Sequence, residues 1–159
     1  MRVVVTTPGP DFPASPITLV GLDELLATVD YVVCFAPANA ETENMFNAAR
    51  FRQMKRDAFF INASRGGLVD EVALAQALDE GLIAGCALDV GRAPDQMPSP
   101  FLARHPKVIA TPHSGGLTPQ AVAHQALETV AQVAAILQGT IPPGAVNPEH
   151  ASRLSRLKA

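Results

Sequence analysis

The stretch AFFINASRGGLVDE, residues 58–71, begins as an apolar run and turns polar within a few residues. Its first part has the character of a buried strand, and Arg65 with two glycines stands on the turn that follows. Asp70 then precedes an amphipathic pattern as a helix N-cap, and Gly81 marks the end of that helix. The stretch therefore predicts a strand, a turn and a helix, with an arginine at the carboxyl end of the strand.

The same alternation continues in both directions from this unit. Strands are predicted by short apolar runs at residues 1–5, 30–36, 58–62, 83–90 and 107–111. Helices are predicted at residues 22–29, 47–55, 69–81 and 118–139. Strands that alternate with helices favour a mostly parallel sheet covered on both faces. We therefore expect an α/β fold with an open, doubly wound parallel sheet.

The last predicted helix has clear start and stop signals. Thr118 is its expected N-cap, Pro119 takes the first helical position, and Gly139 follows the last turn. Its apolar residues at helical spacing predict one buried stripe, formed by Val122, Ala126, Val130, Val133 and Leu137.

Composition narrows the class of protein. The chain has 159 residues, 48% of them apolar, which suits one domain with its own core. No apolar run approaches the roughly 20 residues that span a bilayer. The net charge of −3 and the scattered basic residues argue against nucleic acid or a membrane as partner. Cys34 and Cys86 lie in apolar runs, so we interpret them as small buried side chains of a cytoplasmic protein rather than as a disulfide.

Three predicted strands end on residues whose side chains can bind a ligand or transfer a proton. Arg65, Asp89 and His113 each follow a strand, and the carboxyl ends of parallel strands meet at one edge of a sheet. Alone, each has an ordinary explanation: a surface ion pair, a turn former or a loop histidine. Together they combine a bidentate carboxylate clamp with a proton donor that works near neutral pH. The combination suggests oxidation or reduction of a carboxylate-bearing alcohol or ketone.

The segments INASRGGLVDEVALAQAL, IAGCALDV and VIATPHSGGLT, in this order, resemble the D-isomer-specific 2-hydroxyacid dehydrogenases over residues 1–147. This resemblance implies a Rossmann-type domain and hydride transfer between NAD(P)H and a small 2-keto or 2-hydroxy acid. It implies that Arg65 binds the substrate carboxylate and that His113 is the general acid/base. Asp89 would contact the nicotinamide carboxamide.

The resemblance also implies a set of cofactor-binding residues and no metal site. They are Thr7, Ala36, Pro37, Thr42, Ala63, Ser64, Arg65, Asp89, His113, Gly115 and Gly116. Thr7 stands where members that use NAD carry an acidic residue for the ribose 2′-hydroxyl. Because Thr7 tolerates a 2′-phosphate, the cofactor is expected to be NAD or NADP.

Two departures from the family pattern stand out. Pro94 takes the place of the family glutamate that hydrogen-bonds the catalytic histidine, so we expect the adjacent Asp95, or else Gln96, to serve instead. The chain also has no G-x-G-x-x-G turn. We therefore expect the first strand and this turn to lie upstream of Met1, and the isolated chain to bind dinucleotide weakly or not at all.

On this reading residues 1–139 are part of a dinucleotide-binding domain that lacks its first strand and Gly-rich turn. Residues 140–159 would cross toward an absent substrate domain. A homodimer is expected of the complete protein. The alternatives are a non-catalytic NAD(H)-binding, corepressor-like protein and a degenerate, truncated gene product.

Overall fold

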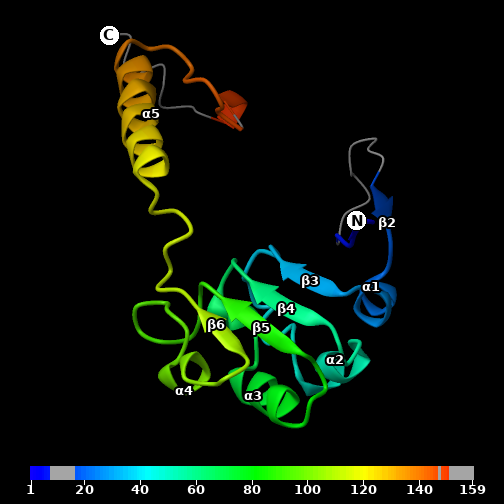
Figure 1. The fold of residues 1–159 in the computed structure, drawn as a ribbon. Helices are drawn as coiled ribbons and strands as arrows, with labels where there is room; N and C mark the ends of the chain where they lie inside the picture. Colours follow the sequence, from blue (N-terminus) through cyan, green and yellow to red (C-terminus); the bar gives the residue numbers. More distant parts are fainter. Residues whose placement is uncertain (8–16, 147, 151–159) are drawn as a thin grey trace. The chain divides into compact units, whose positions relative to one another are not determined.

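The computed structural model describes residues 1–7, 17–146 and 148–150 (Figure 1). The chain divides into two compact units, Met1–Ser114 and Gly115–Ala159, which are treated separately below. The predicted crossing segment, 140–159, lies partly outside the described residues. Within the part of the chain that the structure describes, no helix is long and apolar enough to cross a membrane.

The first unit is built on a parallel four-stranded sheet of order β3-β4-β5-β6. Its strands are β3 (Tyr31–Cys34), β4 (Phe59–Asn62), β5 (Gly85–Leu88) and β6 (Val108–Ala110). Two shorter strands, β1 (Val4–Val5) and β2 (Thr18–Leu19), form a separate parallel pair. The alternation of parallel strands and helices confirms the predicted α/β class.

The helices of the first unit are α1 (Leu22–Thr28), α2 (Ala48–Gln53), α3 (Glu71–Asp79), α4 (Pro100–Ala103) and the 3-10 helix η1 (Gly66–Leu68). Helices α1, α2 and α3 lie within the ranges predicted from the sequence, whereas α4 and η1 were not predicted. The Asp70 carboxylate caps α3 by accepting hydrogen bonds from Val72 N and Ala73 N, as predicted. Gly81 follows that helix at φ +64°, a conformation that favours glycine.

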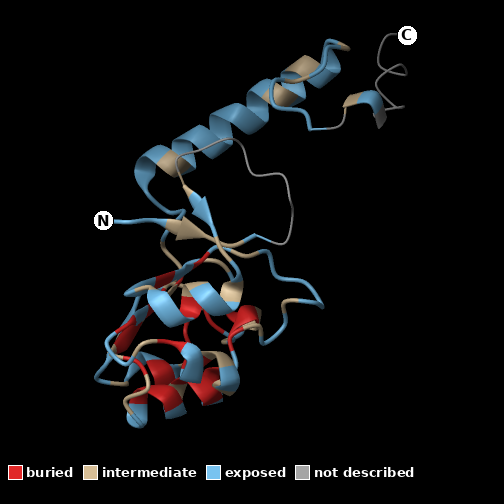
Figure 2. Cartoon of the chain, turned by 90° about the vertical axis from the view of Figure 1, so that its right-hand side faces the viewer, coloured by how far each residue is buried: buried red, intermediate tan, exposed pale blue. Residues whose placement is uncertain are grey.

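The core lies on one face of the four-stranded sheet. Alternate strand residues such as Val32, Phe60 and Leu88 are buried against side chains of α1–α4. Figure 1 shows α2, α3 and α4 gathered on one side of the strands, and Figure 2 shows the buried residues concentrated there. Three rings, Phe46, Phe51 and Phe60, pack together at its centre.

The opposite face of the sheet is apolar but exposed. Tyr31, Val33 and Ile109 are 61%, 50% and 71% exposed. The expectation that both faces of the strands are buried is therefore not met in the first unit. The physical reason is that the described helices α1–α4 all contribute to the core on the other face.

The second unit contains helix α5 (Pro119–Leu137) and the 3-10 helix η2 (Pro148–His150). Thr118 Oγ1 accepts a hydrogen bond from Ala121 N, Pro119 opens the helix, and Gly139 follows it at φ +69°, all as predicted. The predicted buried stripe is wrong: no residue of α5 is buried, and Val130 is 67% exposed. Helical spacing indicates an apolar side of a helix, but burial also needs a neighbour packed on that side.

The two cysteines are free and buried. Burial raises the pKa of Cys86 to about 12. Burial also raises the pKa of Cys34, an effect partly opposed by a backbone hydrogen bond with Ala36. Both thiols therefore behave as small core side chains, as the sequence indicates.

Candidate active site

The turn that carries Arg65 is built by a buried asparagine. Asn62 is 1% exposed at the end of β4, and its amide Nδ2 donates to Arg65 O at 2.9 Å while its Oδ1 accepts from Ser64 N at 3.1 Å. Ser64 Oγ donates to Ala36 O at 2.6 Å, which joins the turn to the end of β3. The backbone is thereby fixed while the Arg65 guanidinium remains exposed and donates to Ser64 O at 2.7 Å.

Asn62 is a residue whose role sequence reasoning missed. The available signal was an asparagine that ends a buried strand directly before a polar turn, where its side chain can bond nearby backbone groups.

The two glycines after the strands bring two loops into backbone contact. A Cβ at Gly66 would lie 2.1 Å from the carbonyl carbon and oxygen of Gly91, and a Cβ at Gly91 would lie 2.4 Å from Pro98 Cα. No side chain fits at such separations. These two glycines let the loop after β4 pack on the loop after β5.

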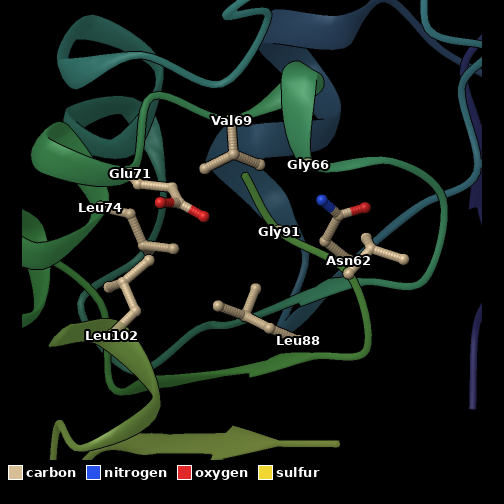
Figure 3. A pocket seen from close by; sticks show the side chains of 9 residues that line it. Asn62, Gly66, Val69, Glu71, Leu74, Leu88, Gly91 and Leu102 are labelled. Atoms are coloured by element: carbon tan, nitrogen blue, oxygen red, sulfur yellow. The ribbon is translucent and has the colours of Figure 1, made fainter. Parts of the chain in front are cut away.

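Figure 3 shows a small hollow beneath these two loops. Its lining includes Asn62, Gly66 and Gly91, together with Glu71 from the first turn of α3. Glu71 is 8% exposed, and its carboxylate accepts hydrogen bonds from Arg92 N and Ser99 Oγ. A buried carboxylate with two donors costs far less than an unpaired one, so Glu71 anchors both ends of the loop after β5.

Asp89 joins the ends of β5 and β6. Its backbone N donates to Asn62 O at 3.1 Å, and its Oδ1 accepts from Ser114 N at 2.9 Å and from Thr111 Oγ1. Asp89 thus lies beside the segment that carries His113. Thr111 and Ser114 were not singled out from the sequence, because their role depends on a residue more than 20 positions away.

His113 adopts an unusual backbone conformation, with φ +51°. Its N donates to Thr111 O at 3.0 Å, and the residue is half-buried. Non-glycine residues are uncommon in this region, and such conformations cluster at functional sites. The hydrogen bonds of Asp89 to the residues on both sides of His113 hold the segment in place.

Asp95 lies at the tip of the loop after β5. Gln96 N donates to Ala93 O at 2.8 Å, which closes a turn with Pro94 in its second position. Gln96 has φ +63°, and Asp95 Oδ1 accepts from Met97 N at 3.1 Å. Both Asp95 and Gln96 are exposed, and the described hydrogen bond of Asp95 serves its own loop.

The remaining predicted residues fall at other strand ends. Thr42 Oγ1 donates to Pro37 O at 2.7 Å and accepts from Asn39 N, so the hydroxyl shapes the loop after β3. Ala63 is exposed after β4, and Thr7 is exposed after β1. Gly115 and Gly116 are exposed at the start of the second unit.

Comparison with known proteins places this arrangement in context. Residues 1–115 match the family described as D-isomer specific 2-hydroxyacid dehydrogenase, NAD binding domain. The chain is 43% identical over 129 residues to a glyoxylate/hydroxypyruvate reductase B from Escherichia fergusonii, a match that covers 80% of this chain and 40% of that protein.

Solved structures of related enzymes are also similar to this chain. A D-lactate dehydrogenase from Lactobacillus jensenii, solved with NAD⁺, superposes with a TM-score of 0.82 at 30% identity, covering 91% of this chain and 48% of that one. An acyclic imino acid reductase in complex with NADPH and D-Arg gives a TM-score of 0.78 at 27% identity, covering 89% and 45%. The chain thus spans less than half the length of each of these three relatives.

Proposed function

Since this chain belongs to the D-isomer specific 2-hydroxyacid dehydrogenases, with residues 1–115 matching their NAD binding domain, we propose that its protein is an oxidoreductase. The reaction is hydride transfer between NAD(P)H and a small 2-keto or 2-hydroxy acid. The substrate class follows from the glyoxylate/hydroxypyruvate and D-lactate activities in the names of its relatives.

One observation carries the proposal. Arg65, Asp89 and His113 follow β4, β5 and β6, which are neighbouring parallel strands, so all three stand at one edge of the sheet. Ligands of open α/β sheets bind at this edge. The left-handed backbone of His113, held through Asp89, adds the kind of strain that functional sites retain.

Each residue has a definite chemical role in the proposal. The exposed Arg65 guanidinium binds the substrate carboxylate through two parallel hydrogen bonds, which orients the adjacent carbonyl. In reduction, His113 gives a proton to the carbonyl oxygen, and in oxidation it takes that proton from the hydroxyl. Asp95 is the proposed hydrogen-bond partner of His113; its Oδ1 accepts from Met97 N, and its second oxygen is a further acceptor.

The residues present fit the nicotinamide end of a dinucleotide better than its pyrophosphate. The Asp89 carboxylate is oriented by Thr111 and Ser114 at the sheet edge, where it suits a carboxamide donor. The 159 residues contain no G-x-G-x-x-G turn, the motif that cradles pyrophosphate. When bound, NADH or NADPH supplies the hydride.

The proposed cofactor contacts follow the strand ends. Ala63 and Ser64 are the proposed contacts of the nicotinamide ribose. Gly115 and Gly116 of the second unit are also proposed cofactor-binding residues. Ala36, Pro37 and Thr42 lie toward the adenosine. Thr7 stands at the ribose 2′ position and permits NADP as well as NAD. We further propose a cytoplasmic homodimer for the complete protein.

A second candidate function is dinucleotide binding without turnover. The observation that favours it is the loop after β5, in which Pro94 replaces the family glutamate and the Asp95 side chain is bonded to Met97 N. A protein of this kind binds NAD(H) and leaves 2-keto acids unchanged.

The test is steady-state oxidation of NADH and NADPH by the protein expressed from its whole natural gene, with glyoxylate, hydroxypyruvate and pyruvate as substrates. Arg65→Ala is expected to lower kcat/KM at least about 100-fold, because two charge-assisted hydrogen bonds are lost. Arg56→Ala, which removes another exposed arginine, is the matched control and leaves kcat/KM unchanged.

Loss of a general acid/base typically costs about 10²–10⁴-fold in rate, and His113→Gln is expected in that range. NADH binding without turnover of any of the three acids would replace the proposal with the second candidate. Full activity of Arg65→Ala would remove the role given to Arg65.

A further inference from the structure

Arg92 makes more contacts with the turn after Arg65 than with its own loop. Its Nε donates to Val69 O at 3.0 Å, and its Nη2 donates to Gly67 O at 2.8 Å. These carbonyls lie two and four residues beyond Arg65. The planar guanidinium therefore holds two carbonyls of one short segment at once, those of Gly67 and Val69, a geometry for which arginine is better suited than lysine.

The same guanidinium ties in a third loop. Arg92 Nη2 also lies 2.7 Å from Glu43 Oε1 and 2.7 Å from Asn44 Oδ1. Asn44 N in turn donates to Gly67 O at 2.9 Å, and Asn44 has φ +51°. The loop after β3 and the turn after β4 are thus cross-linked through a residue of the loop after β5.

The backbone of Arg92 is itself anchored. Arg92 N donates to the buried Glu71 carboxylate at 3.0 Å, and the preceding Gly91 lies against Gly66 with no room for a Cβ (Figure 3). The Arg65 turn is therefore held by Asn62 on one side and by the Gly91–Arg92 pair on the other.

We infer that Arg92 is a positioning residue that fixes the Arg65 turn for binding of the substrate carboxylate. The inference rests on the proposed function for its substrate, but the clamp, meaning the hydrogen bonds from Arg92 to Gly67 O and Val69 O, is observed without any substrate. A bidentate contact depends on the direction of the guanidinium fork, so a loosened turn weakens carboxylate binding.

Hydrogen exchange tests the clamp without reference to activity. In Arg92→Gln, the amides of Asn44, Leu68 and Val69, which bond within the clamped segments, are expected to exchange at least tenfold faster than in the parent protein. Arg92→Lys is expected to restore part of the protection. Lys55→Gln breaks an ion pair with Asp30 and is the control, with exchange at these three amides unchanged.

Kinetics test the consequence in the protein expressed from its whole natural gene. Arg92→Gln is expected to raise KM for the 2-keto acid about tenfold, with kcat within about twofold and KM for the dinucleotide unchanged, because a ground-state binding contact is weakened. The KM of Arg92→Lys for the 2-keto acid is expected to lie between the values of Arg92→Gln and the parent protein.

The outcomes separate the two proposals. A parent protein that turns over no 2-keto acid overturns the proposed function, and the exchange measurement alone then decides the inference about Arg92. Unchanged exchange at Asn44, Leu68 and Val69 overturns the inference, as does a higher KM for the dinucleotide with no change for the 2-keto acid.

Discussion

The two faces of the β3–β6 sheet have similar side chains and opposite environments. Phe59 and Phe60 are neighbours on β4, yet Phe60 is 0% exposed and Phe59 is 41% exposed. Phe60 packs in the core with Phe46 and Phe51, whereas Phe59 stacks on Tyr31 of the adjacent strand at 5.6 Å. An apolar strand therefore does not by itself tell which of its faces the rest of the chain covers.

The candidate active site is supported from the covered side. The hollow below its loops is lined by Leu74 of α3 and Leu102 of α4, both 0% exposed. The same helices that bury one face of the sheet thus support the loops after β4 and β5. Four predictions test this difference between the two faces.

The largest expected effect is on the covered face. Phe60→Ala removes a fully buried ring and is expected to lower the free energy of unfolding by about 3–5 kcal/mol. Phe59→Ala loses mainly a cross-strand aromatic pair and is expected to cost about 1 kcal/mol. Urea unfolding of the two variants measures both values, and equal losses would contradict the difference between the faces.

The next effect concerns the loops that rest on that face. Gly66→Ala places a methyl group where Gly91 backbone atoms lie and is expected to cost about 1–3 kcal/mol through overpacking. Gly116→Ala is the control, because a Cβ there meets nothing within 4 Å. Thermal unfolding of both variants provides the comparison, and a Gly66→Ala protein as stable as the control would show that the loops separate freely.

A smaller effect is expected at the start of α3, a helix of the covered face. Asp70→Ala removes the side chain that accepts from two backbone N–H groups, which typically costs about 1 kcal/mol. Asp57→Ala is the control for loss of an exposed carboxylate, with a change of less than about 0.5 kcal/mol. The denaturant midpoints of Asp70→Ala and Asp57→Ala measure the two stability changes. Equal midpoints for the two variants would exclude a stabilising cap.

The smallest effect is a pH dependence carried by Cys86. Its pKa is raised to about 12 in the folded chain from 9.0, so the unfolded state loses the thiol proton first. The contribution of this difference to the free energy of unfolding is fully present below pH 9 and is lost as the pH rises from there toward 12. At pH 9.5 the loss is under about 1 kcal/mol. Urea unfolding at pH 7.5 and 9.5 measures this slope.

Cys86→Ala provides the control for that slope. Between pH 7.5 and 9.5 the free energy of unfolding of Cys86→Ala should decrease less than that of the parent protein. An equal decrease in the two proteins would assign the pH dependence to other groups.

The sequence by itself determined the alternation of the main strands and helices, but it did not predict β2, α4 or η1. The N-caps Asp70 and Thr118 and the glycines Gly81 and Gly139 were predicted correctly, because caps and left-handed ends depend on a few adjacent residues. The parallel sheet followed from the alternation of strands and helices, and it placed Arg65, Asp89 and His113 on adjacent strands.

Only the tertiary structure decided which face of the sheet is covered and what holds the site. The exposure of Tyr31 and Ile109, the bond from Asn62 to Arg65 and the clamp of Arg92 on Gly67 and Val69 had no counterpart in the local pattern. The Arg92 contacts join residues more than 20 positions apart, and the covered face depends on where four helices pack. Local propensity sets the elements, whereas burial and side-chain partners depend on which of those elements come together in space.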